Sequence, residues 1–362
     1  MDNRTKYNLF LFLSNLARNI IEFFSIVLLY EKGYDIKTLF LFLGVYYLVS
    51  VLVCIFSIWI GNKYNYNIIL VLSCFLFGFS YYYLSVMDTT LVNILIFGVL
   101  QAISNYTYHS ARHYFGISIV GNKKEVSEAL IFTYIPLIFI PYVGAYLTNH
   151  FSLTTTIIVV IILLLVSMIP IFKIKLKGRK EHLDIRKSKP NNLMFWILEQ
   201  FKVIFLLLEP LYLYIYIDNN LEYLGVFNII IGLASLVFIY FIGRKKNTRK
   251  WFRYLNILFC LILVFKLNIR SKFLLYIVAL LEGLGIKLYE MVSTTNLYNI
   301  SDKKKVGSYL MLAEIVFGTI SSIICFSFYL IDNLIISMYI CILGIFLSAF
   351  VIKPLKNTFG TS

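Results

Sequence analysis

The sequence has few charged residues for its length. Of 362 residues, 14% are Asp, Glu, Lys or Arg, and 60% belong to the hydrophobic set. Soluble domains carry about 25% charged residues, because their surface must be covered by polar groups. The shortage excludes an ordinary soluble domain and indicates that much of the surface faces a lipid bilayer.

The sequence also lacks the motifs of several enzyme and binding classes. No GxxxxGK[ST] segment is present, so the chain has no P-loop for ATP hydrolysis. Its five cysteines show no CxxC spacing and lie inside apolar runs. That placement is typical of small buried side chains rather than of a redox or metal site. We expect no cofactor and no resident metal.

Long apolar runs separated by short polar breaks take up most of the chain. A helix needs about 20 apolar residues to cross the hydrocarbon core, so twelve spans use about 240 residues and leave short connections. The pattern predicts an all-α integral membrane protein with twelve transmembrane helices. Their expected positions are 7–30, 36–60, 66–87, 90–115, 126–148, 152–173, 193–217, 222–242, 252–269, 273–298, 307–330 and 333–353.

The net charge of +15 is divided unevenly between alternate connections. With the N-terminus inside, 24 of the 33 Lys and Arg residues fall in inner segments and 5 fall in outer loops. An excess of basic residues on the cytoplasmic side sets the orientation of membrane proteins. We therefore expect a multi-pass plasma membrane protein with both termini in the cytoplasm. The charge is then explained by the lipid bilayer, and nucleic acid is not an expected partner.

The most basic connection, 175–192, separates two parts of the chain that resemble each other. Segment 59–65 ends the second span and 241–247 ends the eighth, and the loops 121–126 and 301–306 also correspond. Both pairs lie about 180 residues apart, which indicates a tandem repeat. We expect two six-helix bundles, 1–174 and 193–362, joined by a cytoplasmic linker at 175–192.

This plan resembles the major facilitator superfamily, and two segments support the resemblance. Residues 139–147 are similar to the GPxxGGxL pattern in the fifth span of proton-coupled exporters, with Ile140 and Ala145 in place of two glycines. Residues 57–63 fall where that family has its GxxxDRxGRR loop, with Gly61 in place of the acidic residue. The resemblance implies a monomer with a central cavity that opens alternately to each side.

Polar and ionisable side chains inside the spans carry the strongest functional signal. Each charge at mid-membrane costs about 2.5–3.5 kcal/mol on insertion scales, so it should face a cavity or a partner. These residues gather on spans one, four, seven and ten, which line the cavity in the resembled family. The candidate substrate and proton pathway is Asn15, Arg18, Glu22, Gln101, Asn105, His109, Arg112, Lys202, Glu209, Glu282, Lys287, Tyr289, Glu290 and Glu314.

The signs of these charges predict their roles. The candidate proton or substrate sites are Glu22, Glu209, Glu282 and Glu290. Their expected counter-ions are Arg18, Lys202 and Lys287. A carboxylate beside a cation in low dielectric can exchange a proton for a charged or polar solute. Lys266, near the end of the ninth span, is expected to extend to the membrane rim instead.

These features favour a secondary active transporter for a small amphipathic or charged solute. Proton-coupled export is the first expectation, and uptake of nutrients or peptides is the alternative. A membrane-embedded transferase would use His109 or the Glu31 and Asp35 pair, but the short outer loops leave little room for a polar acceptor. His109 and His113 have the i, i+4 spacing of metal ligands, but no third ligand is evident. We therefore expect a carrier and not an enzyme.

Overall fold

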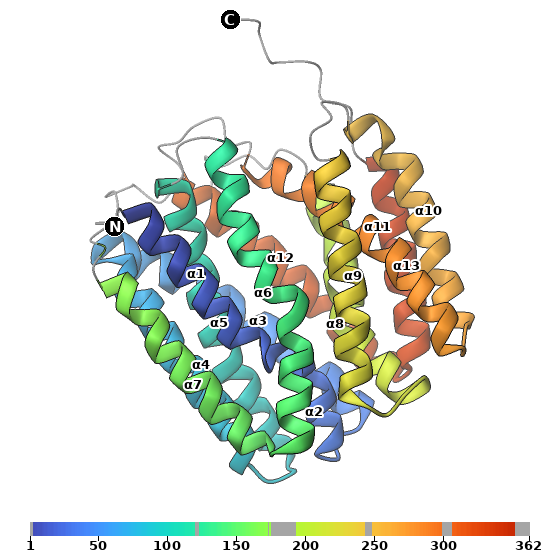
Figure 1. Ribbon diagram of the computed structural model, residues 1–362, viewed down its shortest axis with the longest axis horizontal. Coiled ribbons are helices and arrows are strands. Elements are labelled where there is room, and N and C mark those ends of the chain that lie inside the picture. Colours follow the sequence, from blue (N-terminus) through green and yellow to red (C-terminus); the bar gives the residue numbers. More distant parts are fainter. Residues whose placement is uncertain are drawn as a thin grey trace, which may run out of the picture.

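A computed structural model shows a bundle of helices (Figure 1). It describes residues 3–119, 123–172, 174, 193–242, 248–298 and 306–351. Within the helices, the side chains of 113, 115–119, 123–136, 238–242, 248–251, 288, 290–298 and 306–307 lie outside the description. Every regular element in the described ranges is helical. The predicted linker at 175–192 lies outside the described residues.

The helices agree with the predicted spans to within a few residues. In chain order they are α1 (Asn3–Asn19), η1 (Glu22–Phe24), α2 (Ser25–Glu31), α3 (Ile36–Lys63), α4 (Tyr66–Val86), α5 (Leu91–Ile119), α6 (Lys123–His150), α7 (Leu153–Phe172), α8 (Leu193–Tyr216), α9 (Leu221–Ile242), α10 (Thr248–Asn268), α11 (Lys272–Tyr298), α12 (Val306–Ile331) and α13 (Leu334–Val351). The helix α1 begins and α13 ends at one end of the bundle, and α2 lies at the other, which we call the α2 end (Figure 1).

Seven helical segments of the described chain are long and apolar enough to cross a membrane. They are Asn3–Glu31, Ile36–Lys63, Tyr66–Val86, Leu91–Arg112, Leu153–Phe172, Ser308–Ile331 and Leu334–Val351. Helix α8 is not among them, since Glu199, Lys202 and Glu209 interrupt its apolar sequence. Seven is fewer than the twelve spans expected from the polar breaks.

The outward faces of the helices are apolar. On α4, Ile68, Leu72, Phe75 and Phe79 are half or more exposed, and their spacing places them in one stripe along the helix. A soluble protein rarely exposes a continuous apolar stripe of this kind. These faces therefore indicate contact with lipid.

The first span is broken, although the sequence predicted one helix over 7–30. Between α1 and α2 the hydrogen bonds join residues three apart, from Ile21 N to Arg18 O at 3.2 Å and from Phe24 N to Ile21 O at 3.1 Å. The side-chain amides of Asn15 and Asn19 donate to carbonyls four residues earlier, which competes with regular helix geometry. The break falls between Arg18 and Glu22.

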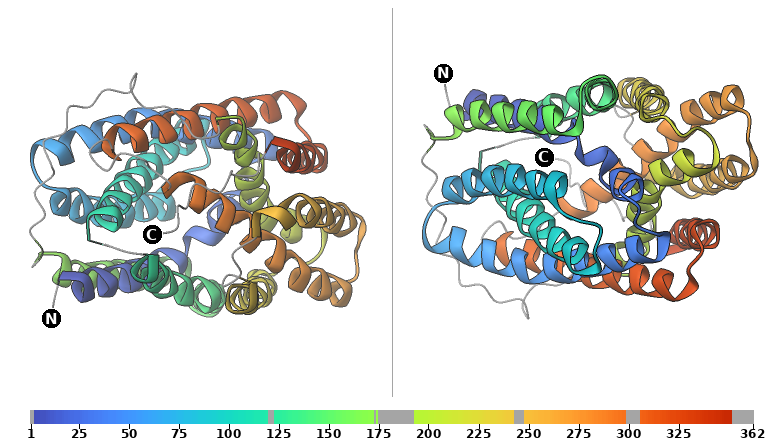
Figure 2. Two further views of the ribbon diagram at one scale, coloured as in Figure 1. Left: turned by 90° about the horizontal axis from the view of Figure 1, so that it is seen from above. Right: turned by 90° about the horizontal axis from the view of Figure 1, so that it is seen from below.

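Two helix pairs on opposite edges connect the two parts of the chain. Helix α3 runs beside α12 on one edge, and α6 beside α9 on the other (Figure 2). The second pair approaches closely, since a Cβ at Gly225 would lie 2.6 Å from the Cα of Tyr142. Gly144 of α6 also has to be small, because a side chain there would collide with the Ile20 carbonyl at the break in the first span.

Candidate functional site

Arg18 of α1 is buried between two aromatic rings. Its guanidinium carbon lies 4.3 Å from the ring centroid of Phe77 on α4 and 4.2 Å from that of Tyr108 on α5. Its Nη2 also donates to the carbonyl and hydroxyl oxygens of Ser73, at 3.2 and 3.4 Å. The residue is 2% exposed. Stacking and hydrogen bonds together fix the plane of the guanidinium group.

Asn105 of α5 connects Arg18 to Glu22. Its Oδ1 accepts a hydrogen bond from Arg18 Nη1 at 3.0 Å, and its Nδ2 donates to Glu22 Oε1 at 2.8 Å. The same Nδ2 lies 3.3 Å from Gln101 Oε1 and 3.3 Å from the Tyr46 hydroxyl. Arg18 and Glu22 are therefore connected through an amide.

A cavity of about 150 Å³ lies beside this cluster. Its walls are formed by Asn15, Arg18, Asn19, Glu22, Tyr108, His109, Arg112 and Leu137. Five of the predicted pathway residues thus line one cavity, at the break in the first span. Glu314 of α12 adds a second carboxylate, which interacts electrostatically with Arg112. Among the described residues, this region holds two arginines and two glutamates.

A second cluster centres on Lys266 of α10. Its Nζ donates to Glu282 Oε2 of α11 at 2.7 Å and forms an ion pair with Glu209 Oε1 of α8. It also lies 4.6 Å from the ring centroid of Phe227 on α9. Lys266 and Glu282 are both 0% exposed. The expectation that Lys266 extends to the rim was wrong, because two carboxylates hold its ammonium group inside the bundle.

Lys202, one of the expected counter-ions, lies beside Glu199, which was not among the candidate proton sites. Its Nζ lies 3.9 Å from Glu199 Oε1, one turn earlier on α8, and 4.8 Å from the ring centroid of Tyr289 on α11. The Tyr289 ring in turn stacks on Phe195 at 5.5 Å. These contacts place Lys202 and Tyr289 together, while Glu209 pairs with Lys266 instead.

Lys266 was not among the predicted pathway residues. The expected cations for the glutamates of the seventh and tenth spans were Lys202 and Lys287, and Lys266, near the end of the ninth span, was expected at the rim. Lys287 is 4% exposed on α11, and the side chain of Glu290 lies outside the described residues. No group of three metal-ligating side chains occurs in the described ranges, and the side chain of His113 falls outside them.

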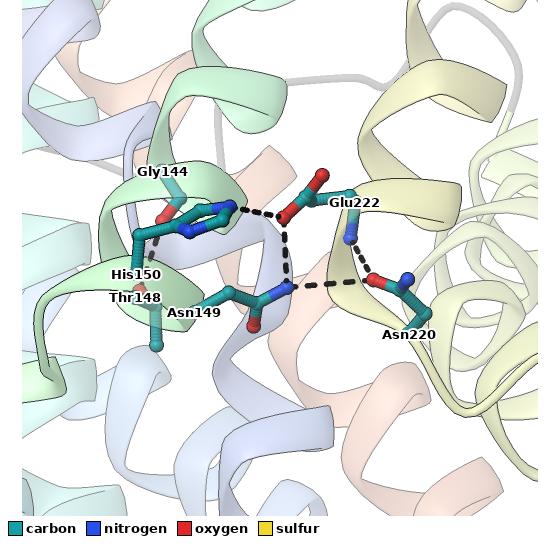
Figure 3. Close-up of polar contacts among 6 residues, drawn as sticks. All are labelled: Gly144, Thr148, Asn149, His150, Asn220 and Glu222. Carbon is teal, nitrogen blue, oxygen red and sulfur yellow. Dashed lines mark hydrogen bonds and ion pairs between the residues drawn. The ribbon is translucent and has the colours of Figure 1, made fainter.

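Polar contacts join the two parts of the chain at the α2 end. Glu222 Oε1, at the start of α9, accepts a hydrogen bond from Asn149 Nδ2 at 3.2 Å and lies 3.2 Å from His150 Nε2 (Figure 3). Both partners belong to the last turn of α6. Across the bundle, the Tyr214 hydroxyl of α8 donates to Glu31 Oε1 of α2 at 2.6 Å. We call these two sets of contacts the α2-end latch.

Asp35 and Glu31, the residues considered for a transferase, both have structural partners. Asp35 caps α3 by accepting a hydrogen bond from Thr38 N at 2.9 Å. Hydrogen bonds from the Thr38 side chain and backbone hold the pKa of Asp35 below its usual value. Glu31 belongs to the latch. Each carboxylate therefore stabilises the fold at this end of the molecule.

The helical fold of this chain is shared by proteins of known structure. Two solved structures of the nucleoside transporter NupG, one of them a point mutant, share it. The mutant structure gives a TM-score of 0.70 at 11% identity, over 96% of this chain and 98% of that one. The other gives 0.69 at 10% identity, over 97% and 98%. Both neighbours are transporters and not enzymes, and at this identity the likeness shows the fold alone.

Sequence comparison gives no family assignment. No family model matches the chain, and no curated protein matches it.

Proposed function

We propose that this chain is a secondary active transporter of the plasma membrane that moves a small polar solute by alternating access. The observation that carries the proposal is the cluster of Arg18, Asn105 and Glu22 beside a cavity at the break in the first span. Transporters commonly bind solutes at discontinuous helices, where polar groups are free to meet a ligand. The solute would bind in this cavity.

The proposed topology has twelve spans in two six-helix halves, 1–174 and 193–362, with both termini in the cytoplasm. The excess of basic residues on the inner connections supports this orientation, and the burial of Lys266 removes one residue from the outer set. The α2 end then faces outward. The pairs α3 with α12 and α6 with α9 would form the contacts between the halves. We expect the transporter to work as a monomer.

The solute we propose is a polar molecule with little net charge. The walls of the cavity offer amides, arginines and a carboxylate, so they can donate and accept hydrogen bonds. The shared fold makes nucleosides the first solutes to test. A polar wall favours nutrient uptake over export of amphipathic compounds. The Gly144 pattern that suggested export has a packing reason in the contact with Ile20.

Transport into proteoliposomes tests the proposal. Labelled nucleosides, sugars and amino acids would be compared for the wild type, Arg18→Gln and Glu22→Gln. Asp218→Asn is a matched control, because it changes a carboxylate in an ion pair with Lys272 near the surface. We expect at least one solute to enter, with a loss in both cavity variants and none in the control. Equal transport by all four proteins would contradict the assignment of the cavity.

Export is tested separately in an efflux-deficient bacterium. Accumulation of dyes and antibiotics would be compared for the wild type and Glu22→Gln, with and without a protonophore. Lower accumulation that both the variant and the protonophore abolish would establish proton-driven export. Equal accumulation throughout, together with nucleoside entry into proteoliposomes, would establish uptake.

A further inference from the structure

We infer that Lys266, Glu209 and Glu282 form a buried site that binds one proton, and that this site is the coupling-ion site of the transporter. The coupling role rests on the proposed function. Proton binding rests only on the contacts of the three side chains, which come from α10, α8 and α11. We call these residues the buried triad.

The charges of the buried triad do not cancel. One ammonium group faces two carboxylates, so the fully ionised triad carries one negative charge. Lys266 and Glu282 are 0% exposed, and Glu209 is 6% exposed. An uncompensated charge so far from water is costly, and buried ionisable groups are neutralised by a partner or by a proton. One bound proton makes the triad neutral.

Other charged side chains on the surrounding helices are directed elsewhere. On α8, Lys202 pairs with Glu199, and after α10 the Arg270 guanidinium donates to the Tyr212 hydroxyl at 2.9 Å. Lys287 lies five residues after Glu282, which places it about 140° further around α11.

The neighbouring helix α9 contributes uncharged groups. These are the Phe227 ring against Lys266 and the buried Tyr223. Glu222, at the start of α9, belongs to the latch. Among the described residues, no charged side chain outside the triad pairs with it, so the excess negative charge is left for a bound proton to neutralise.

The contacts also indicate where the proton binds and why the ion is a proton. Glu282 Oε2 accepts the hydrogen bond from Lys266, whereas the buried Oε1 has no hydrogen-bond partner among the described residues. A proton can add to Oε1 without breaking the contact between Oε2 and Lys266. An alkali cation would need the position between the two carboxylates that the ammonium group already occupies.

Helix α8 connects the buried triad to the substrate cavity. Glu209 is followed by Pro210, which lacks the backbone N–H that a regular helix uses. Further along, Tyr214 reaches Glu31 of α2, and η1, which carries Glu22, packs against α8 as well. If α8 moves when the triad gains or loses its proton, the movement would therefore change the positions of side chains at both the cavity and the latch.

Infrared difference spectroscopy on the full chain in lipid tests proton binding and needs no solute. At neutral pH, Glu282→Gln should lose one protonated-carboxyl equivalent relative to the wild type. Glu209→Gln should lose the same band, because Lys266 and Glu282 then form a neutral pair without a proton. Lys266→Met should gain one equivalent, since both carboxylates must then be protonated. Asp218→Asn should match the wild type.

If the wild type, Glu209→Gln and Glu282→Gln show the same protonated-carboxyl bands, the triad does not bind a proton. If Glu282→Gln does not fold, Glu209→Gln alone still tests whether the triad binds a proton. This variant leaves the ion pair between Lys266 and Glu282 in place. If no solute of the panel is transported but the infrared bands are as expected, the proposed transport function would be refuted and the proton site would still be supported.

Hydrogen–deuterium exchange of α2 tests the coupling role. After correction for the chemical exchange rate, protection of Ser25–Glu31 should change with pH in the wild type and in Asp218→Asn. It should be independent of pH in Glu282→Gln, where the triad cannot change its protonation. The same pH dependence in all three proteins would overturn the coupling role.

Discussion

The two buried clusters hold their charges in different ways. In the cavity cluster, the Asn105 amide stands between Arg18 and Glu22, and both charged side chains also line a cavity. In the buried triad, Lys266 contacts Glu209 and Glu282 directly, and none of the three lines that cavity. Charges separated by an amide remain available to a solute. A buried group of charges in direct contact, with one carboxylate in excess, is suited to holding a proton.

The balance of charge differs as well. Among the described residues, the cavity region has two arginines and two glutamates, whereas the triad has one cation for two carboxylates. The depth of an intramembrane charge therefore says little about its role. The contacts and the sum of the local charges are more informative.

The largest effect is expected from Lys266→Met, which breaks the triad. It leaves two buried carboxylates without a cation, and breaking a buried ion pair costs about 3–5 kcal/mol. The loss should be greater in alkaline buffer, since both carboxylates then have to be protonated against the solvent. Thermal unfolding in detergent across a pH series measures this loss of stability. A loss below about 1 kcal/mol, the range of exposed ion pairs, would contradict the buried contacts.

Arg18→Gln should lower solute transport by about ten- to 100-fold, because hydrogen bonds to charged groups contribute about 1.5–3 kcal/mol. Arg18→Lys keeps the charge but cannot reproduce the stacked guanidinium plane, so its rate should fall between those of the wild type and Arg18→Gln. Initial rates in proteoliposomes give this order. Equal rates for Arg18→Lys and the wild type would show that charge alone is sufficient.

Asn105→Asp should convert the cavity cluster into a second proton site. It places an extra carboxylate between Arg18 and Glu22, which gives this cluster the same excess of one negative charge as the triad. Infrared difference spectra should gain one protonated carboxyl, whereas Asn105→Leu should gain none. No added band in Asn105→Asp would mean that the charge count does not decide where protons bind.

The latch should contribute a smaller amount. Tyr214→Phe removes the hydrogen bond to Glu31, and Glu222→Ala removes the contacts with Asn149 and His150. Each hydrogen bond of this kind is worth about 0.5–1.5 kcal/mol. We expect hydrogen exchange in α2 to rise by about two- to tenfold in Tyr214→Phe, while α13 remains unchanged. Unaltered hydrogen exchange of α2 in both variants would show that these contacts do not stabilise the α2 end.

The smallest effect is expected at Asp35. Asp35→Ala removes the cap of α3 and should cost about 0.5–1 kcal/mol at neutral pH. Because the pKa of Asp35 is lowered by folding, its contribution is present above the unfolded pKa of about 3.9 and is lost as pH falls through the folded pKa. Asp35→Asn keeps a capping oxygen and should be stable at neutral pH without this acid dependence. Acid unfolding of the three proteins compares them.

Hydropathy was sufficient to place the helices, because a chain in lipid must satisfy its backbone hydrogen bonds within each segment. It could not find the break after Asn19, since the competing bonds of Asn15 and Asn19 leave the hydropathy unchanged. Polar side chains within the first and fourth spans could be predicted to face a cavity or a partner, because a charge exposed to lipid is costly. The partner of Glu209 could not be predicted, because it depends on which side chains of α8 and α10 meet in the folded bundle.

The most direct test of the division between the two clusters compares Glu22→Gln with Glu282→Gln in proteoliposomes, using the solute that the panel identifies. Exchange of labelled for unlabelled solute is measured at equal pH, and accumulation is measured under a pH gradient. We expect Glu282→Gln to retain exchange and lose accumulation, and Glu22→Gln to lose both. Accumulation by Glu282→Gln at the level of the wild type would contradict this expectation.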